Sequence, residues 1–221
     1  MGNAPSVEPV ELTEFVYKSV TVFAERESTL VEIPTTRFSK IAQSPSLCVV
    51  PDLVGGTVGL RIWPGSLAFV DQIAKLSFNQ GSVIELGCGV GLPGMFFGKK
   101  ISNSAVLLTD RESVRPAVER AICANGLSNC SFASFDWGSS EDLLKMSKLR
   151  FDLVIASEIV YAEEMEPLMN ALEAVVKPHT TLAIQYTPRS DTDVEYFEKK
   201  ILSKFRLLDK FEQIHILAGQ L

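Results

Sequence analysis

Histidine is scarce in this chain of 221 residues, and its cysteines lack the spacing of metal ligands. The two histidines, His179 and His215, stand far apart, and no two of the four cysteines form a C-x-x-C pair. Zinc sites draw on closely spaced Cys and His ligands, so we expect no metal. The cysteine pattern also favours reduced thiols. We therefore expect a cytoplasmic protein, with the nucleus as a second compartment.

Basic residues are too few to give the chain a positive charge. It has 21 Lys and Arg against 27 Asp and Glu, a net charge of −6. Proteins that bind nucleic acid usually carry a basic face that neutralises phosphates. Nucleic acid is therefore not an expected partner.

Long apolar runs are absent as well. No run reaches the roughly 18 residues that a transmembrane helix needs, and no secretory signal pattern opens the chain. One membrane signal is present, because residues 1–6 fit the M-G-x-x-x-[ST] pattern for myristoylation of Gly2. A single acyl chain gives only a weak, reversible tether. Any membrane contact is therefore expected to depend on acylation of Gly2.

Strands and helices alternate through most of the chain, as is typical of a parallel sheet covered on both faces. The last two strands are joined by too few residues for a crossover and should pair antiparallel. We therefore expect an α/β, Rossmann-like sheet of seven strands with a reversed strand at its end. The expected strands are 83–86, 105–109, 131–135, 151–156, 181–186, 205–210 and 213–217, and the expected helices are 65–78, 112–125, 165–176 and one capped by Asp191.

The N-terminal part differs from this alternation. Residues 15–23 and 29–33 are rich in Val, Thr and aromatic residues, with a polar stretch between them. This pattern predicts a β-hairpin or two strands of a meander. We expect residues 1–54 to form an N-terminal extension and residues 55–221 to form the α/β core.

The run ELGCGVG at residues 85–91 directly follows an apolar stretch. It predicts a strand that ends in a glycine-rich turn and opens a helix, a geometry that holds nucleotide-like ligands. The frame E-x-G-x-G-x-G is the arrangement used to approach S-adenosyl-L-methionine, but a dinucleotide frame G-x-G-x-x-G also fits from Gly89. Such turns also need glycine for steric reasons alone. The candidate cofactor residues here are Glu85, Gly87, Cys88, Gly89 and Gly91.

Two acidic residues follow the next strands. Asp110 ends the second core strand, where a carboxylate can accept hydrogen bonds from both hydroxyls of a ribose. The alternative is a cap on the helix that starts near Glu112. Asp136 and Trp137 follow the third strand, where an indole can cover an adenine and a carboxylate can bind its amine. The alternative for Trp137 is a rim aromatic that buries part of the core.

The run SEIVY at residues 157–161 leaves the fourth strand. In a doubly wound order this strand lies beside the first, at the switch point where ligands bind. Glu158 and Tyr161 would then lie near the reacting methyl group and could orient an amine. The alternatives are a helix cap and a core aromatic. Trp63 precedes Pro64 at the start of the first core helix, where a packing role explains its position equally well.

Taken together, these motifs resemble the seven-β-strand methyltransferases of the lysine-modifying group called family 16, from about residue 55 onward. The resemblance implies S-adenosyl-L-methionine as cofactor, and Tyr161 matches the tyrosine of the family's D-x-x-Y element. Glu158 stands where most lysine-modifying members have Asp, and an S-E-x-x-Y form is similar to a branch that methylates histidine in a ribosomal protein. The positions that match cofactor contacts in the family are Trp63, Gly87, Gly89, Asp110, Trp137 and Ala156.

The expected activity is methyl transfer from S-adenosyl-L-methionine to a side-chain nitrogen of a protein, with lysine expected and histidine as the alternative acceptor. Glu158 and Tyr161 are the expected catalytic residues. In-line displacement needs neither a metal nor a covalent intermediate. Because a fold does not determine a substrate, a small-molecule methyltransferase and a non-catalytic cofactor-binding module stay open. We expect a monomer that acts on an unidentified protein.

Overall fold

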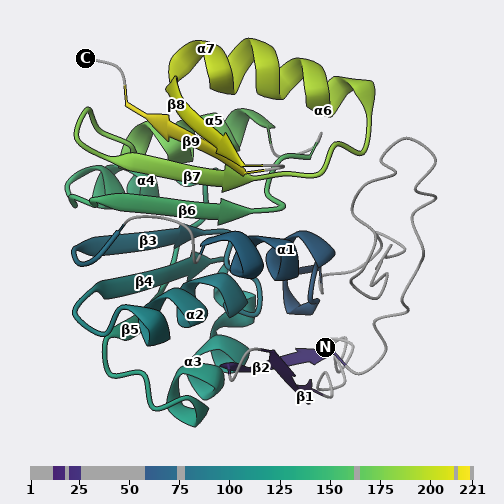
Figure 1. Ribbon diagram of the computed structural model, residues 1–221, viewed down its shortest axis with the longest axis vertical. Helices are drawn as coiled ribbons and strands as arrows, with labels where there is room; N and C mark the ends of the chain where they lie inside the picture. The colour runs from purple at the N-terminus through teal and green to yellow at the C-terminus, as the bar shows by residue number, and fades with distance from the viewer. Residues whose placement is uncertain are drawn as a thin grey trace, which may run out of the picture.

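The structure, a computed structural model, contains one open sheet covered by helices and a separate two-stranded hairpin (Figure 1). No helix in the part of the chain that it describes is both long and apolar enough to cross a membrane. Gly2 and the predicted boundary at residues 54 and 55 lie outside that part. The described residues are 12–17, 20–25, 58–73, 78–161, 165–211 and 214–219.

The large sheet has the strand order β5-β4-β3-β6-β7-β9-β8. The five strands from β5 to β7 are parallel, and β9 runs antiparallel to both of its neighbours. The predicted seven-stranded sheet is thus confirmed. The reversed strand is last in the chain but lies inside the sheet, so that β8 forms the edge. The strands are β3 (Ser82–Leu86), β4 (Ala105–Asp110), β5 (Cys130–Ser134), β6 (Leu153–Ser157), β7 (Thr181–Gln185), β8 (Arg206–Phe211) and β9 (Ile214–Ala218).

Helices cover both faces of this sheet (Figure 1). One apolar layer joins α1, α2 and α3 to Val83 and Leu153, whereas the other joins α4 and α5 to Ile84 and Val154. Neighbours along a strand point to opposite faces, so β3 and β6 are buried on both sides, and their residues are apolar apart from Ser82, Glu85 and Ser157. The helices are α1 (Pro64–Ile73), α2 (Leu92–Lys100), α3 (Arg115–Ala124), α4 (Ser140–Ser147), α5 (Met165–Val175), α6 (Asp191–Tyr196) and α7 (Leu202–Lys204), with a π-helical turn at Phe197–Ile201 between the last two.

The N-terminal hairpin is present, but the first of its predicted strands, 15–23, is wrong. Strands β1 (Leu12–Tyr17) and β2 (Val20–Glu25) pair antiparallel, with Tyr17 opposite Val20. The chain therefore reverses inside the range 15–23, which the sequence predicts as one strand. Apolar and aromatic residues continue on both sides of this turn, so composition alone does not reveal it. The predicted second strand, 29–33, lies outside the described residues.

Strand β2 is held against the core by Val20 and Asn125. Val20 is fully buried in the apolar layer of α1 to α3. The Asn125 amide accepts a hydrogen bond from the Thr21 backbone N–H at 2.8 Å and donates to the Thr21 carbonyl at 2.6 Å. It also donates to the carbonyl of Ala121 in α3 at 2.7 Å. One side chain thus links the hairpin to the end of a core helix.

Replacing Asn125 with Asp is expected to loosen the hairpin. The carboxylate keeps an acceptor for the Thr21 N–H but brings a negative oxygen against two carbonyls that lose their donor. We expect amide exchange in β2 to quicken by about tenfold, measured by hydrogen exchange and mass spectrometry. Asn129→Asp is the matched control, because Asn129 donates to the carbonyls of Gly98 and Ser104. Equal effects of both changes on β2 would contradict a specific link.

The cap of α6 also differs from the prediction, which placed it at Asp191. Ser190 is the N-cap, and its hydroxyl accepts a hydrogen bond from the Asp193 N–H at 3.2 Å. The Asp193 carboxylate accepts in return from the backbone N–H groups of Ser190, at 3.1 Å, and Arg189, at 3.0 Å. This is a capping box, which leaves Asp191 as the first helical residue. The box also fixes the backbone of Arg189 beside the site described next.

Candidate functional site

The glycine turn between β3 and α2 has a backbone that favours glycine at three positions. Gly87, Gly89 and Gly91 have φ angles of +60°, +53° and +79°, in the region that L side chains rarely adopt. A Cβ at Gly87 would also lie 2.7 Å from Ile159 Cγ2, and one at Gly89 would lie 3.0 Å from a carbonyl oxygen. All three left-handed glycines belong to the frame that starts at Glu85, whereas the dinucleotide frame from Gly89 contains two of them together with Gly94.

Glu85 and Cys88 lie beneath this turn. The Glu85 side chain is buried, and Oε2 accepts a hydrogen bond from the Gly94 N–H of α2 at 3.0 Å. Burial raises the pKa of the Glu85 carboxyl well above its usual value. Cys88 donates its backbone N–H to the Thr109 carbonyl at 2.9 Å, and burial raises the pKa of its thiol. These contacts fasten the turn to β4 and to the first turn of α2.

Asp110 stands beside the glycine turn because β3 and β4 are parallel neighbours. Its Oδ2 accepts a hydrogen bond from the Gly89 N–H at 2.8 Å, and its Oδ1 accepts from the Arg111 N–H at 2.7 Å. A carboxylate oxygen accepts about two hydrogen bonds, so each oxygen can take one more donor. Burial raises the pKa of Asp110. The next helical turn begins after Arg111 without any side-chain cap, which removes the helix-cap alternative for Asp110.

Trp137 packs against the same turn, whereas Asp136 faces solvent. A Cβ at Gly87 would lie 3.3 Å from Cη2 of Trp137, so the indole ring lies close to the turn. Its Nε1 is buried and has no hydrogen-bond partner among the described residues. Buried N–H groups are normally paired, so this one offers a donor to a ligand. Asp136 is exposed, and its Oδ1 accepts a hydrogen bond from the Gly138 N–H at 2.9 Å.

The end of β6 lies beside β3, as predicted for the switch point of the sheet. Ala156 is buried and pairs in register with Leu86. Two residues further on, Glu158 has a φ of +60° and is the only non-glycine residue with positive φ in the described part of the chain. Such backbone strain is concentrated at functional sites. The geometry therefore singles out Glu158 independently of its sequence motif.

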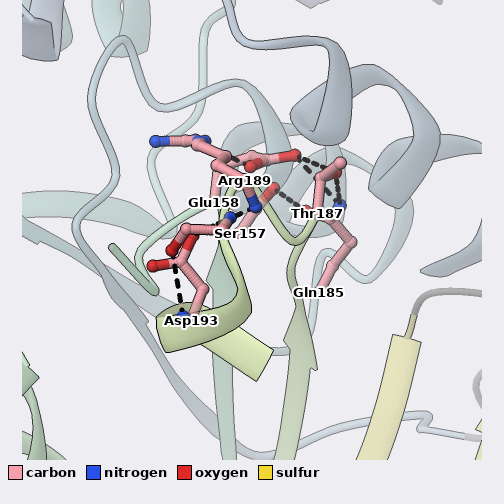
Figure 2. Close-up of polar contacts among 7 residues, drawn as sticks. Ser157, Glu158, Gln185, Thr187, Arg189 and Asp193 are labelled. Carbon is pink, nitrogen blue, oxygen red and sulfur yellow. Dashed lines mark hydrogen bonds and ion pairs between the residues drawn. The ribbon is translucent and has the colours of Figure 1, made fainter. Parts of the chain in front are cut away.

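Figure 2 shows that the Glu158 carboxylate meets side chains from the last residue of β7 and from the segment after it. Its Oε1 accepts hydrogen bonds from Thr187 Oγ1 at 2.7 Å and from Gln185 Nε2 at 3.1 Å. Its Oε2 pairs with Nη2 of Arg189 at 2.9 Å. Ser157 Oγ donates to Oε1 of Gln185 at 2.9 Å and so orients that amide. Only 6% of the Glu158 side chain is exposed. Its negative charge is therefore stabilised by these donors and hardly by solvent.

Arg189 brings the predicted aromatic residues into the same group. The Cζ atom of Arg189 lies 4.8 Å from the ring centroid of Trp63 and 6.0 Å from that of Tyr161. We call the set of Trp63, Glu158, Tyr161, Gln185, Thr187 and Arg189 the Glu158 cluster. Gly65 of α1 also borders it, because a Cβ there would overlap Oε1 of Glu158.

Three members of this cluster, Gln185, Thr187 and Arg189, were missed by the sequence analysis. Their position at or after the end of β7 could have indicated them, because β6 and β7 are parallel neighbours and their carboxyl ends share one edge of the sheet. The prediction considered motifs only up to the end of the fourth core strand and so did not include them. Among the described residues, no group of three or more His, Cys, Asp and Glu side chains is arranged to hold a metal ion.

Comparison with known proteins identifies a matching family model and several related methyltransferases. A family model described as lysine methyltransferase matches residues 42–203. EEF1A lysine methyltransferase 3 of Mus musculus is 26% identical over 152 residues, which cover 66% of this chain and 62% of that protein. Histidine protein methyltransferase 1 homolog of Dictyostelium discoideum is 28% identical over 118 residues, which cover 50% of this chain and 37% of that protein. The chain thus spans less than two thirds of either relative.

A solved structure shares the fold. M. jannaschii TYW2 in complex with AdoMet matches with a TM-score of 0.51 at 14% identity, over 96% of this chain and 85% of that chain. This likeness concerns the arrangement of the sheet and its helices. The family model matches well over half of the chain. The chain therefore belongs to the lysine methyltransferase family.

Proposed function

We propose that this protein transfers a methyl group from S-adenosyl-L-methionine to a lysine side chain of a protein substrate. The observation that carries the proposal is Glu158, a strained and buried carboxylate at the switch point of a methyltransferase sheet. Members of the same family modify lysine, and the mouse relative is named for that activity. Histidine is the second candidate acceptor, because the Dictyostelium relative is named for histidine methylation.

Features of the glycine turn fit this cofactor. Asp110 has an open acceptor position on each oxygen for the ribose hydroxyls, and the indole N–H of Trp137 lacks a partner in the described structure. We assign cofactor binding to the turn at Gly87, Gly89 and Gly91, to Asp110 and to Trp137. Glu85, Cys88 and Ala156 support the turn from below. When bound, S-adenosyl-L-methionine would supply an electrophilic methyl group.

The residues of the Glu158 cluster would receive the acceptor. A hydrogen bond to the Glu158 carboxylate orients the nitrogen, and the rings of Trp63 and Tyr161 shield it from water. Free lysine has a pKa of about 10.4, so its nitrogen must lose a proton before it offers a lone pair. Most of the rate enhancement would then come from proximity and alignment.

Cofactor affinity is expected to fall as the pH is lowered below neutral. Burial raises the pKa of Asp110, so this carboxyl takes up its proton at a higher pH than an ordinary Asp does. A protonated carboxyl loses acceptor positions that the ribose hydroxyls need. Calorimetric titration with S-adenosyl-L-methionine at several pH values measures the effect. The Asp110→Asn variant should bind at least about tenfold more weakly and lose most of this pH dependence, which separates Asp110 from the buried Glu85.

Labelling of a cell lysate tests the proposed activity. The purified protein and S-adenosyl-L-methionine with a radioactive methyl group are added to the lysate, and labelled proteins are hydrolysed to identify the modified residue. Methyl-lysine in a discrete protein supports the proposal, whereas methyl-histidine supports the second candidate. Label in small molecules would indicate a different substrate class. Cofactor binding without any label in several lysates would indicate a non-catalytic module.

A further inference from the structure

Arg189 is held in place by both its backbone and its side chain. Its N–H donates to the Asp193 carboxylate of the α6 capping box at 3.0 Å. Its guanidinium pairs with Glu158 at 2.9 Å and stacks over Trp63. Ion pairs between exposed side chains contribute little to stability. Here the Glu158 side chain is only 6% exposed, so the charge of Arg189 acts on a buried partner.

The Glu158 carboxylate has one open acceptor position, and it lies next to Arg189. Oε1 already accepts hydrogen bonds from Thr187 and Gln185, whereas Oε2 accepts only from Arg189 among the contacts of the described residues. A carboxylate accepts about four hydrogen bonds, so a further nitrogen fits best on Oε2. Two donors on one oxygen, each at about 2.9 Å, place the two nitrogens roughly 5 Å apart. An acceptor nitrogen bound there would therefore lie close to the guanidinium.

The charge of this site decides which form of the acceptor it binds. An isolated carboxylate stabilises a protonated amine and raises its pKa, whereas a nearby cation lowers that pKa. With Arg189 in place, the pair of charges sums to zero and the guanidinium repels an ammonium group. A neutral amine can still donate a hydrogen bond to Oε2.

We infer that Arg189 is a specificity-determining residue that makes the site select an unprotonated acceptor nitrogen. The inference rests on the proposed function, which defines the acceptor. The proton of the lysine ammonium passes to solvent before the amine docks on Glu158. The nitrogen lone pair then forms the new C–N bond as the methyl–sulfur bond breaks, so the positive charge of the sulfonium passes to nitrogen. The cationic product is repelled by Arg189, which favours its release.

Among the described residues, few other titratable groups face this pair. Asp193 of α6 is occupied by the backbone N–H groups of Arg189 and Ser190. Tyr161 approaches the guanidinium with its ring face. The described segments packed against Glu158 otherwise contribute groups that do not titrate near neutral pH. These are Trp63 just before α1, Gly65 in α1, Gln185 at the end of β7 and Thr187 after it.

The test compares pH–rate profiles of Arg189→Met and Arg189→Lys with the wild type. The substrate is the protein labelled in the lysate assay, with S-adenosyl-L-methionine at saturation. We expect the alkaline rise of the Arg189→Met rate to move up by about one pH unit or more. Its rate at pH 7 should fall about tenfold, since one pH unit is a tenfold change in the neutral fraction. Arg189→Lys should keep the wild-type midpoint, and cofactor affinity should change little in either variant.

Thr187→Val serves as the matched control, because it removes a neutral donor from the same carboxylate. It should lower the rate without moving the midpoint. An unmoved midpoint in Arg189→Met would overturn the inference and leave Arg189 a structural residue. A loss of cofactor affinity as large as the loss of rate would make it a cofactor-binding residue and also overturn it. No labelled product from the wild type would instead refute the proposed function, and the inference with it.

Discussion

Replacement of Glu158 by alanine is expected to slow methyl transfer at least about a hundredfold while cofactor affinity changes by less than about threefold. Loss of an orienting group in contact with the reacting atom costs effects of this size. The observed contacts of Glu158 lie with Gln185, Thr187 and Arg189, whereas the glycine turn is bound by Glu85 and Asp110. Labelling rates and calorimetric titration on the same preparations measure the two quantities.

Two further variants separate chemistry from backbone strain at this position. An alanine at a φ of +60° carries a conformational cost of about 1 kcal/mol that glycine avoids. Glu158→Gly therefore removes the carboxylate without that cost, and its rate should match that of Glu158→Ala. Glu158→Gln keeps the shape but loses the charge that pairs with Arg189. Equal losses of rate and cofactor affinity in these variants would mean that Glu158 builds the cofactor pocket.

The sheet and the glycine turn were predictable because their signals are local. The apolar strand before Gly87 and the glycine-rich turn that opens a helix belong to one short run, and the structure confirms both. The register of β3 with β4 then brings Asp110 to the turn. A regular strand order was therefore enough to place that carboxylate.

The partners of Glu158 were not predictable in the same way. Arg189 lies 31 residues from Glu158 in sequence, and it reaches the carboxylate only because β7 lies beside β6. Its exact place depends on the capping box of Ser190 and Asp193, where the sequence analysis chose Asp191 as the cap. Both Ser and Asp are good caps, so residue type did not decide between them. The position of Arg189 thus depends on which residue caps α6, and the sequence did not decide between Ser190 and Asp191.

Gly65→Ala is expected to reduce methyl transfer by at least about thirtyfold through Glu158, because misplacement of a reacting group by about 1 Å has effects of this order. A Cβ at Gly65 would overlap Oε1 of Glu158, so the carboxylate must move and lose its bonds to Thr187 and Gln185. The higher helix propensity of Ala, roughly 0.5–1 kcal/mol over Gly in a helix interior, offsets only part of the cost of the lost buried hydrogen bonds, about 1–3 kcal/mol. A much lower rate with a modestly lower melting temperature is therefore the expected result.

The same pair of residues accounts for glutamate at position 158. The resemblance to the family places Asp at this position in most lysine-modifying members. An Asp would keep the Cγ that borders Gly65 but would lack the outer atom of the longer side chain, so it would fill less of the space above Gly65. In the Glu158→Asp background, Gly65→Ala should therefore lower the rate by a smaller factor than it does in the wild type, a non-additivity typical of residues in contact. Rates of the four proteins complete this double-mutant cycle. Additive effects would show that Gly65 does not make room for the carboxylate, and the glutamate would then need a different explanation.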